Sequence, residues 1–139
     1  MTRNRRETSR LRKSRRFEDL VKIMELLLGP DGCPWDLNQT HRTLLKYLKE
    51  EAGEVAQAVR KNDWENLKEE LGDVLLQVVF HSALAEKAGR FSISDVIETI
   101  NAKLVRRHPH VFGGPKLKTP AQVLVEWERI KKHERNNGS

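Results

Sequence analysis

Apolar residues recur every three or four positions along most of this chain, a spacing that places them on one face of an α-helix. Five segments show the pattern. They cover residues 17–28, 40–61, the stretch between Asp63 and Gly89, 92–107 and 119–135. No segment shows the strict alternation that is typical of a strand. The pattern therefore predicts an all-α protein.

Start and stop signals between these segments support the boundaries. Gly29 to Gly32 end the first helix, and residues 33–39 are expected to be irregular. Thr119, followed by Pro120 and by Gln122 three residues on, is typical of a helix start, as is Ser92 followed by Asp95. We expect a protomer of the four-helix-bundle type with an additional C-terminal helix.

Composition narrows the classes of protein. The chain has 139 residues, enough for one domain, but only 37% are hydrophobic, so self-association would help to bury the helix faces. No apolar run approaches the ~20 residues that span a bilayer. The one cysteine, Cys33, cannot form an internal disulfide and fits a reducing compartment. These features predict a cytoplasmic protein and disfavour a secreted disulfide scaffold or a membrane protein.

Charge is distributed unevenly. The net charge is +6, yet residues 1–16 hold eight basic residues and one acid, which leaves a net charge of −1 for the rest. We interpret 1–16 as a disordered basic arm, 17–135 as a single helical domain and 136–139 as a tail. An arm that contacts nucleic acid or another polyanion is the alternative, which the lack of interleaved aromatic residues disfavours.

Two acidic motifs stand on the second and third predicted helices. The first is Glu50-Glu51-x-x-Glu54, and the second is Glu69-Glu70-x-x-Asp73. At about 100° per residue, the last two acids of each motif lie at similar angles from the apolar face of their helix. In an antiparallel hairpin such pairs either face each other or point apart.

The two pairs are also level along the hairpin. A turn near Asn62 places residues with equal number sums side by side, and both Glu54 with Glu70 and Glu51 with Asp73 add up to 124. Four facing carboxylates would repel one another unless a cation lay between them. Hard oxygen ligands favour Mg²⁺, with Mn²⁺ as the alternative, and this suggests metal-assisted phosphoanhydride chemistry.

Other residues could complete such a site. Lys103, Arg106 and Arg107 follow at helical spacing and suit phosphate oxygens, although a solvated basic helix end explains them equally well. Trp35 lies in the irregular stretch and could stack on a base or pack against the bundle. Glu50 lies on the side of its helix opposite the apolar face, so it is expected in solvent or behind the metal ligands.

Three motifs together resemble the MazG nucleoside triphosphate pyrophosphohydrolase family, over roughly residues 17–135. They are the Gly-Cys-Pro-Trp-Asp loop with Gln-Thr-His, the paired acidic motifs, and the segment Lys-Leu-x-Arg-Arg-His-Pro-His-Val-Phe, at residues 32–41, 50–73 and 103–112. The acidic motifs are shared across the all-α pyrophosphatase superfamily, whereas the other two are specific to MazG. The basic arm matches nothing in the family pattern.

The resemblance implies hydrolysis of NTP or dNTP to the monophosphate and pyrophosphate, with Mg²⁺, in a house-cleaning role. It implies a homodimer, with a dimer of dimers left open, and no membrane partner. Carried over residue by residue, it gives four metal ligands, Glu51, Glu54, Glu70 and Asp73, with Glu50 orienting the attacking water or a ligand. A non-enzymatic helical module with a nucleic-acid-binding arm remains the rival hypothesis, although the sequence disfavours nucleic acid as a partner.

Overall fold

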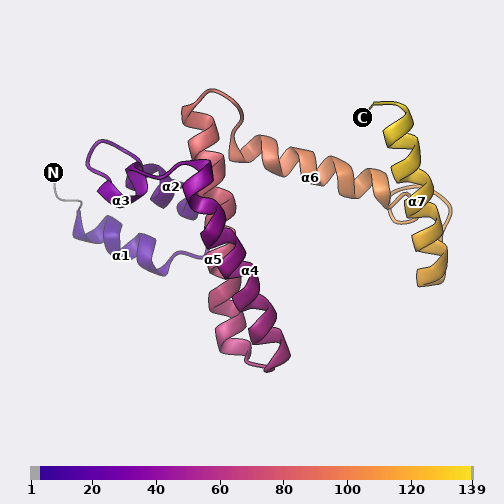
Figure 1. Cartoon of the computed structure of the whole chain (residues 1–139), viewed down its shortest axis with the longest axis horizontal. Helices are drawn as coiled ribbons and strands as arrows, with labels where there is room; N and C mark the ends of the chain where they lie inside the picture. Colours follow the sequence, from indigo (N-terminus) through magenta and orange to yellow (C-terminus); the bar gives the residue numbers. More distant parts are fainter. Residues whose placement is uncertain (1–3, 139) are drawn as a thin grey trace. The chain divides into compact units, whose positions relative to one another are not determined.

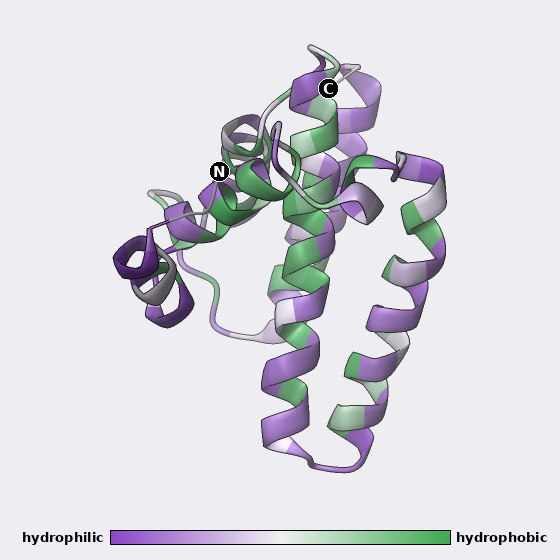
Figure 2. Ribbon diagram, turned by 90° about the vertical axis from the view of Figure 1, so that its left-hand side faces the viewer, coloured by the Kyte–Doolittle hydropathy of each residue, from purple (hydrophilic) through white to green (hydrophobic). Residues whose placement is uncertain are grey.

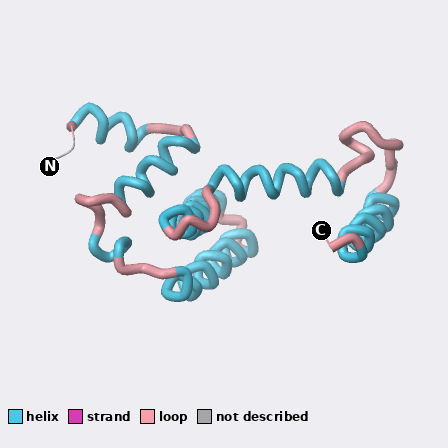
Figure 3. The backbone as a smooth tube through the Cα atoms, turned by 90° about the horizontal axis from the view of Figure 1, so that it is seen from above, coloured by secondary structure: helices cyan, strands magenta, loops and turns pink. Residues whose placement is uncertain are grey.

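The computed structural model describes residues 4–138, and within that range it contains helices and loops and no strand (Figure 3). The predicted all-α class is therefore confirmed. The helices labelled in Figure 1 are α1 Arg5–Lys13, α2 Phe17–Leu27, α3 Pro34–Leu37, α4 His41–Arg60, α5 Trp64–Lys87, α6 Ile93–Arg107 and α7 Pro120–Asn136. Residues up to 93 form one compact unit and those from 94 onward another, so the single domain and bundle expected over 17–135 stay predictions.

The helix boundaries follow the capping residues. Thr40 accepts a hydrogen bond from the Thr43 backbone N–H at 3.2 Å, and Thr43 Oγ1 accepts one from the Thr40 N–H at 2.8 Å, so a reciprocal cap opens α4. Thr119 caps α7 through the Gln122 N–H at 3.2 Å, as predicted. Gly89 ends α5 with a φ of +72°, a backbone conformation that glycine adopts without steric cost.

The core of the first unit forms around the antiparallel hairpin of α4 and α5, against which α2 packs. Figure 2 shows the two long helices joined by one turn, with hydrophobic and hydrophilic positions interspersed along both. The core residues come from all three helices and from the residue that follows α2: Met24, Leu28, Leu44, Val79 and Phe80. The core residues of α4 and α5 thus lie in the half of the hairpin away from its turn.

One local expectation was wrong, and another stays open. Residues 33–39 are not wholly irregular, because Pro34 provides the fixed φ of a first helical position and α3 forms one turn there. Several apolar residues of the predicted inward faces are more than one-third exposed in the single chain: Leu45, Val59, Leu71, Leu75 and Val78. The isolated hairpin therefore presents an unpartnered apolar surface.

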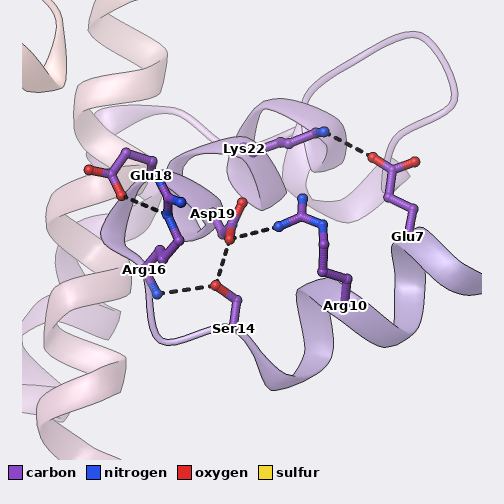
Figure 4. Close-up of polar contacts among 7 residues, drawn as sticks. All are labelled: Glu7, Arg10, Ser14, Arg16, Glu18, Asp19 and Lys22. Carbon is purple, nitrogen blue, oxygen red and sulfur yellow. Dashed lines mark hydrogen bonds and ion pairs between the residues drawn. The ribbon is translucent and has the colours of Figure 1, made fainter.

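The basic arm also differs from expectation, because residues 5–13 form α1 and not a disordered segment. Arg10 pairs with the buried Asp19 of α2 at 3.0 Å, and Ser14 Oγ donates to the same carboxylate at 2.6 Å (Figure 4). Lys22 pairs with Glu7 at 2.9 Å. Polar contacts with α2 hold the segment in place, and the periodicity of apolar residues gives no information about such contacts. Arg3, also assigned to the arm, lies outside the described residues.

The second unit contains α6 and α7. Ile130 is its buried apolar residue, and Glu134 of α7 is a buried acid that binds the end of α6. Helix α7 continues to Asn136, into the predicted tail. Among residues 4–138, no helix combines the length and the apolar character that crossing a bilayer requires.

Candidate active site

Four carboxylates meet across the hairpin. Glu51 and Glu54 project from α4, Glu70 and Asp73 project from α5, and one oxygen from each lies within 4.8 Å of the others. Of the two arrangements left open by the sequence, the facing one is therefore correct. The spacing of three residues within each pair and the turn at Asn62, whose φ is 52°, produce this arrangement.

Burial within the cluster is uneven. Glu70 is buried, Glu51 and Asp73 are half-buried, and Glu54 is exposed. The Oε2 atoms of Glu51 and of Glu70 are both buried and have no hydrogen-bond partner in the described part of the chain. Within residues 4–138, no lysine or arginine forms an ion pair with any of the four acids. The cluster therefore holds more negative charge than its protein neighbours neutralise.

The crowded carboxylates disturb their own ionisation. The hydrogen-bonding contact with Glu54, followed by burial and the charge of Glu54, raises the pKa of Glu70 from 4.5 to about 7. Burial, followed by the charges of Asp73 and Glu54, raises the pKa of Glu51. Both shifts have the direction expected for like charges brought together in a partly desolvated place.

A hard divalent cation fits this donor set. The site offers four carboxylate oxygens within a few ångströms, and two buried oxygens have no donor to satisfy them. Oxygen donors of this kind suit Mg²⁺ or Mn²⁺, whose charge would remove the mutual repulsion. The sequence-predicted ligands are thus the residues that the fold brings together.

Two other candidates lie on the same unit but outside the cluster. Glu50 is exposed and is not one of the four grouped acids, as its position on the helix predicted. Trp35, on α3, is 50% exposed and contacts the Tyr47 ring edge-on, with ring centroids 5.6 Å apart. Half of the indole therefore remains accessible to a ligand.

The three basic candidates belong to the second unit. Lys103, Arg106 and Arg107 line a hollow of about 450 Å³ together with Glu134. Arg106 Nε donates to one oxygen of Glu134 at 2.5 Å and Arg107 to the other at 3.1 Å. Hydrogen bonds from Arg106 and then Arg107 lower the pKa of Glu134 to about 2. Both guanidinium groups thus already hold an anion, the buried carboxylate.

Sequence reasoning missed Glu134 and a histidine pair. Glu134 is 27 residues beyond Arg107 on another helix, and no local pattern announces the contact. His41 and His81 lie with their Nδ1 atoms 2.8 Å apart and their rings stacked. Their numbers add up to 122, close to the sum for the acid pairs, so the same hairpin argument would have found them.

Comparison with known proteins identifies the family. Residues 39–112 match the model of the MazG nucleotide pyrophosphohydrolase domain, which spans both acidic motifs. The chain belongs to the MazG family. The solved structure of a MazG-related protein from Thermotoga maritima superposes with a TM-score of 0.71 at 33% identity, over 83% of this chain and 98% of that one.

Curated relatives of this MazG domain are similar in sequence but longer. The nucleoside triphosphate pyrophosphohydrolase/pyrophosphatase MazG of Thermotoga maritima is 52% identical over 119 residues, which are 86% of this chain and 45% of that protein. The nucleoside triphosphate pyrophosphohydrolase of Escherichia coli is 44% identical over 120 residues, 86% of this chain and 46% of that protein. The chain thus spans about half the length of these relatives.

Proposed function

We propose that this chain is a nucleoside triphosphate pyrophosphohydrolase that depends on a divalent cation, Mg²⁺ or, as the alternative, Mn²⁺. The single observation that carries the proposal is the convergence of Glu51, Glu54, Glu70 and Asp73 from two helices, with two buried oxygens left without donors. Membership of the MazG family and the names of its relatives support the same activity.

The proposed reaction consumes one water and one NTP or dNTP and yields the monophosphate and pyrophosphate. The water oxygen attacks either the α- or the β-phosphorus. The bond from the attacked phosphorus to the α–β bridging oxygen breaks, and a proton of the water leaves to solvent. When bound, the cation would neutralise the triphosphate and lower the pKa of the attacking water.

Each candidate site residue has a role in the proposed reaction. Glu51, Glu54, Glu70 and Asp73 would hold the cation, and Glu50, adjacent to them in sequence, would orient the attacking water or a ligand. Lys103, Arg106 and Arg107 would contact phosphate oxygens, which the guanidinium fork suits as well as it suits the Glu134 carboxylate. The exposed half of Trp35 would stack on the base.

We also propose that the active form is a homodimer. The support is the apolar surface of the hairpin, on which Leu71 is 51% exposed and Leu75 41% exposed. Exposed side chains of this kind on one face of a helix pair are typical of a surface that a second subunit covers. A twofold mate presenting the same hairpin is the simplest partner of matching chemistry.

A panel of NTPs and dNTPs tests the activity. We expect monophosphate and pyrophosphate in equal amounts with Mg²⁺ and neither with excess EDTA. Release of inorganic phosphate instead would mean cleavage at the β–γ bond and would contradict the proposal. No turnover of any triphosphate would favour the rival, a non-enzymatic helical module. A role in removing surplus or damaged nucleotides would follow if altered bases are preferred.

A further inference from the structure

A second charged region of the first unit lies on helices other than α4 and α5. A hollow of about 600 Å³ is lined by α1, by the segment that follows it and by the first turn of α2. Its basic lining residues are Arg6, Arg10, Lys13, Arg15 and Arg16. Ser9 and Ser14 add hydroxyl groups, and Asp19 is the acid among the lining residues.

Most of this positive charge is not neutralised. Asp19 is bound by Arg10, and Arg16 has only a long contact of 3.6 Å with Glu18, in which both side chains are mostly exposed. Within residues 4–138, Arg6, Lys13 and Arg15 have no ion-pair partner. Five cations against one acid leave the lining with an excess of four positive charges.

The hollow has a fixed frame. Ser14 Oγ donates to Asp19 at 2.6 Å and accepts the Arg16 backbone N–H at 3.1 Å, which orders the turn between α1 and α2 (Figure 4). The hydrogen bond from Ser14, followed by the one from Arg10, lowers the pKa of Asp19, so this carboxylate is charged at neutral pH. The Glu7–Lys22 pair and buried Leu11 hold the other side of α1. The backbone that carries the cations is therefore anchored, while the side chains of Arg6, Lys13 and Arg15 are exposed.

The chemistry of the lining selects phosphate. Guanidinium and ammonium groups bind phosphate oxygens through charge-assisted hydrogen bonds, and several cations in one hollow suit several linked phosphates. No aromatic side chain lines the hollow, so it offers no surface on which a base could stack. The five cations line one hollow of about 600 Å³ that is open to solvent, and a short phosphate chain could reach several of them at once.

We propose that this hollow binds a small polyphosphate anion, of the type of inorganic triphosphate, at a site that is separate from the four-acid cluster. None of the four acids lines the hollow, and neither α4 nor α5 contributes to it. The site would therefore take the ligand without a divalent cation, which the acidic cluster cannot do because of its own negative charge.

Titration of the full-length protein with inorganic triphosphate in excess EDTA tests this proposal. The test variant is Arg6→Gln/Lys13→Gln, and the matched control is Arg5→Gln/Arg12→Gln, which removes the same charge from α1 at positions that do not line the hollow. We expect the test variant to weaken binding at least about tenfold and the control less than about threefold. Equal weakening by both would mean unspecific attraction to a basic helix and would overturn the site.

Two further measurements keep the result interpretable. Circular dichroism shows whether α1 remains folded in each variant, and acetylation of Lys13 in the wild type should be slowed by triphosphate while acetylation of Lys61 is not. Unprotected Lys13 would contradict the proposal whatever the variants do. A twelve-nucleotide single-stranded DNA that binds more tightly than triphosphate and depends on the same residues would replace the proposal by a nucleic-acid site. None of these measurements depends on hydrolysis.

Discussion

Glu70 and Glu134 are buried to nearly the same extent, at 9% and 8% exposure, yet their ionisation moves in opposite directions. The pKa of Glu70 is raised to about 7, whereas that of Glu134 is lowered to about 2. Glu70 faces three other carboxylates, while Glu134 lies between two guanidinium groups. Burial alone therefore does not decide what a carboxylate does in this protein; the charge of its neighbours does.

The comparison separates an acid with counter-charges from one without them. Glu134 already has its counter-charges from α6, and its hydrogen bonds tie two helices of the second unit together. Within residues 4–138, Glu70 has no basic partner, and its buried Oε2 has no hydrogen-bond partner. Four acids that meet without a cation from the described part of the chain leave room for an external one. This contrast supports a metal role for the cluster more strongly than its acidity alone.

The largest effect is expected from neutralising the cluster. Glu51→Gln or Asp73→Asn should lower the rate of triphosphate hydrolysis at least about a hundredfold, because cation charge is worth several kcal/mol in such reactions. The exposed Glu69 is a matched control, and Glu69→Gln should be nearly silent. Steady-state kinetics with Mg²⁺ measures the hydrolysis rates of the three variants. Similar small losses in all three variants would remove these acids from the active site.

Breaking the dimer should have the next largest effect. Leu71→Gln/Leu75→Gln should weaken self-association at least about tenfold, because two leucines would no longer be buried by a mate. Leu37→Gln, which changes an exposed leucine on α3, serves as the control. Sedimentation velocity over a concentration series gives the answer. A wild-type protein that remains a 16.1 kDa monomer at micromolar concentration would contradict the proposed dimer.

The loss of folding stability at acidic pH should depend on Glu134. Its folded pKa of about 2 lies below the ordinary 4.5, so the carboxylate stabilises the fold above pH 4.5, and this contribution is lost as the pH falls towards 2. Glu134→Gln should lower the melting temperature at pH 7 and flatten its decline over that range. Thermal melts from pH 7 to pH 2 measure both. An unchanged profile would show that the two arginines do not stabilise the fold through Glu134.

Glu70 should produce a smaller trend of the opposite sign. Its folded pKa of about 7 lies above 4.5, so without metal the cluster destabilises the fold progressively as the pH rises from 4.5 to 7. Mg²⁺ should therefore raise the melting temperature more at pH 8 than at pH 5. Glu70→Gln should reduce the difference. Stabilisation by Mg²⁺ that is equal at both pH values would mean that the metal binds elsewhere.

The sequence predicts most of the helices because their termini carry local signals. Thr119 caps the start of α7, and Gly89 follows the end of α5. Equal number sums place Glu51 opposite Asp73. Contacts between distant segments escape such reasoning. Neither the Asp19 anchor of α1 nor the Glu134 clamp has a local signal, since each joins separate helices. Exposed Leu71 shows the same limit, because periodicity marks an apolar face without saying what covers it.

The central claim is that the four acids bind a divalent cation, and titration with Mn²⁺ followed by electron paramagnetic resonance tests it directly. Free Mn²⁺ gives a strong six-line signal, which bound Mn²⁺ largely loses. We expect a saturable loss of this signal with the wild type, competition by Mg²⁺, and little loss with Glu51→Gln/Asp73→Asn. Wild-type-like binding by the double variant, with its helical circular dichroism intact, would contradict the account.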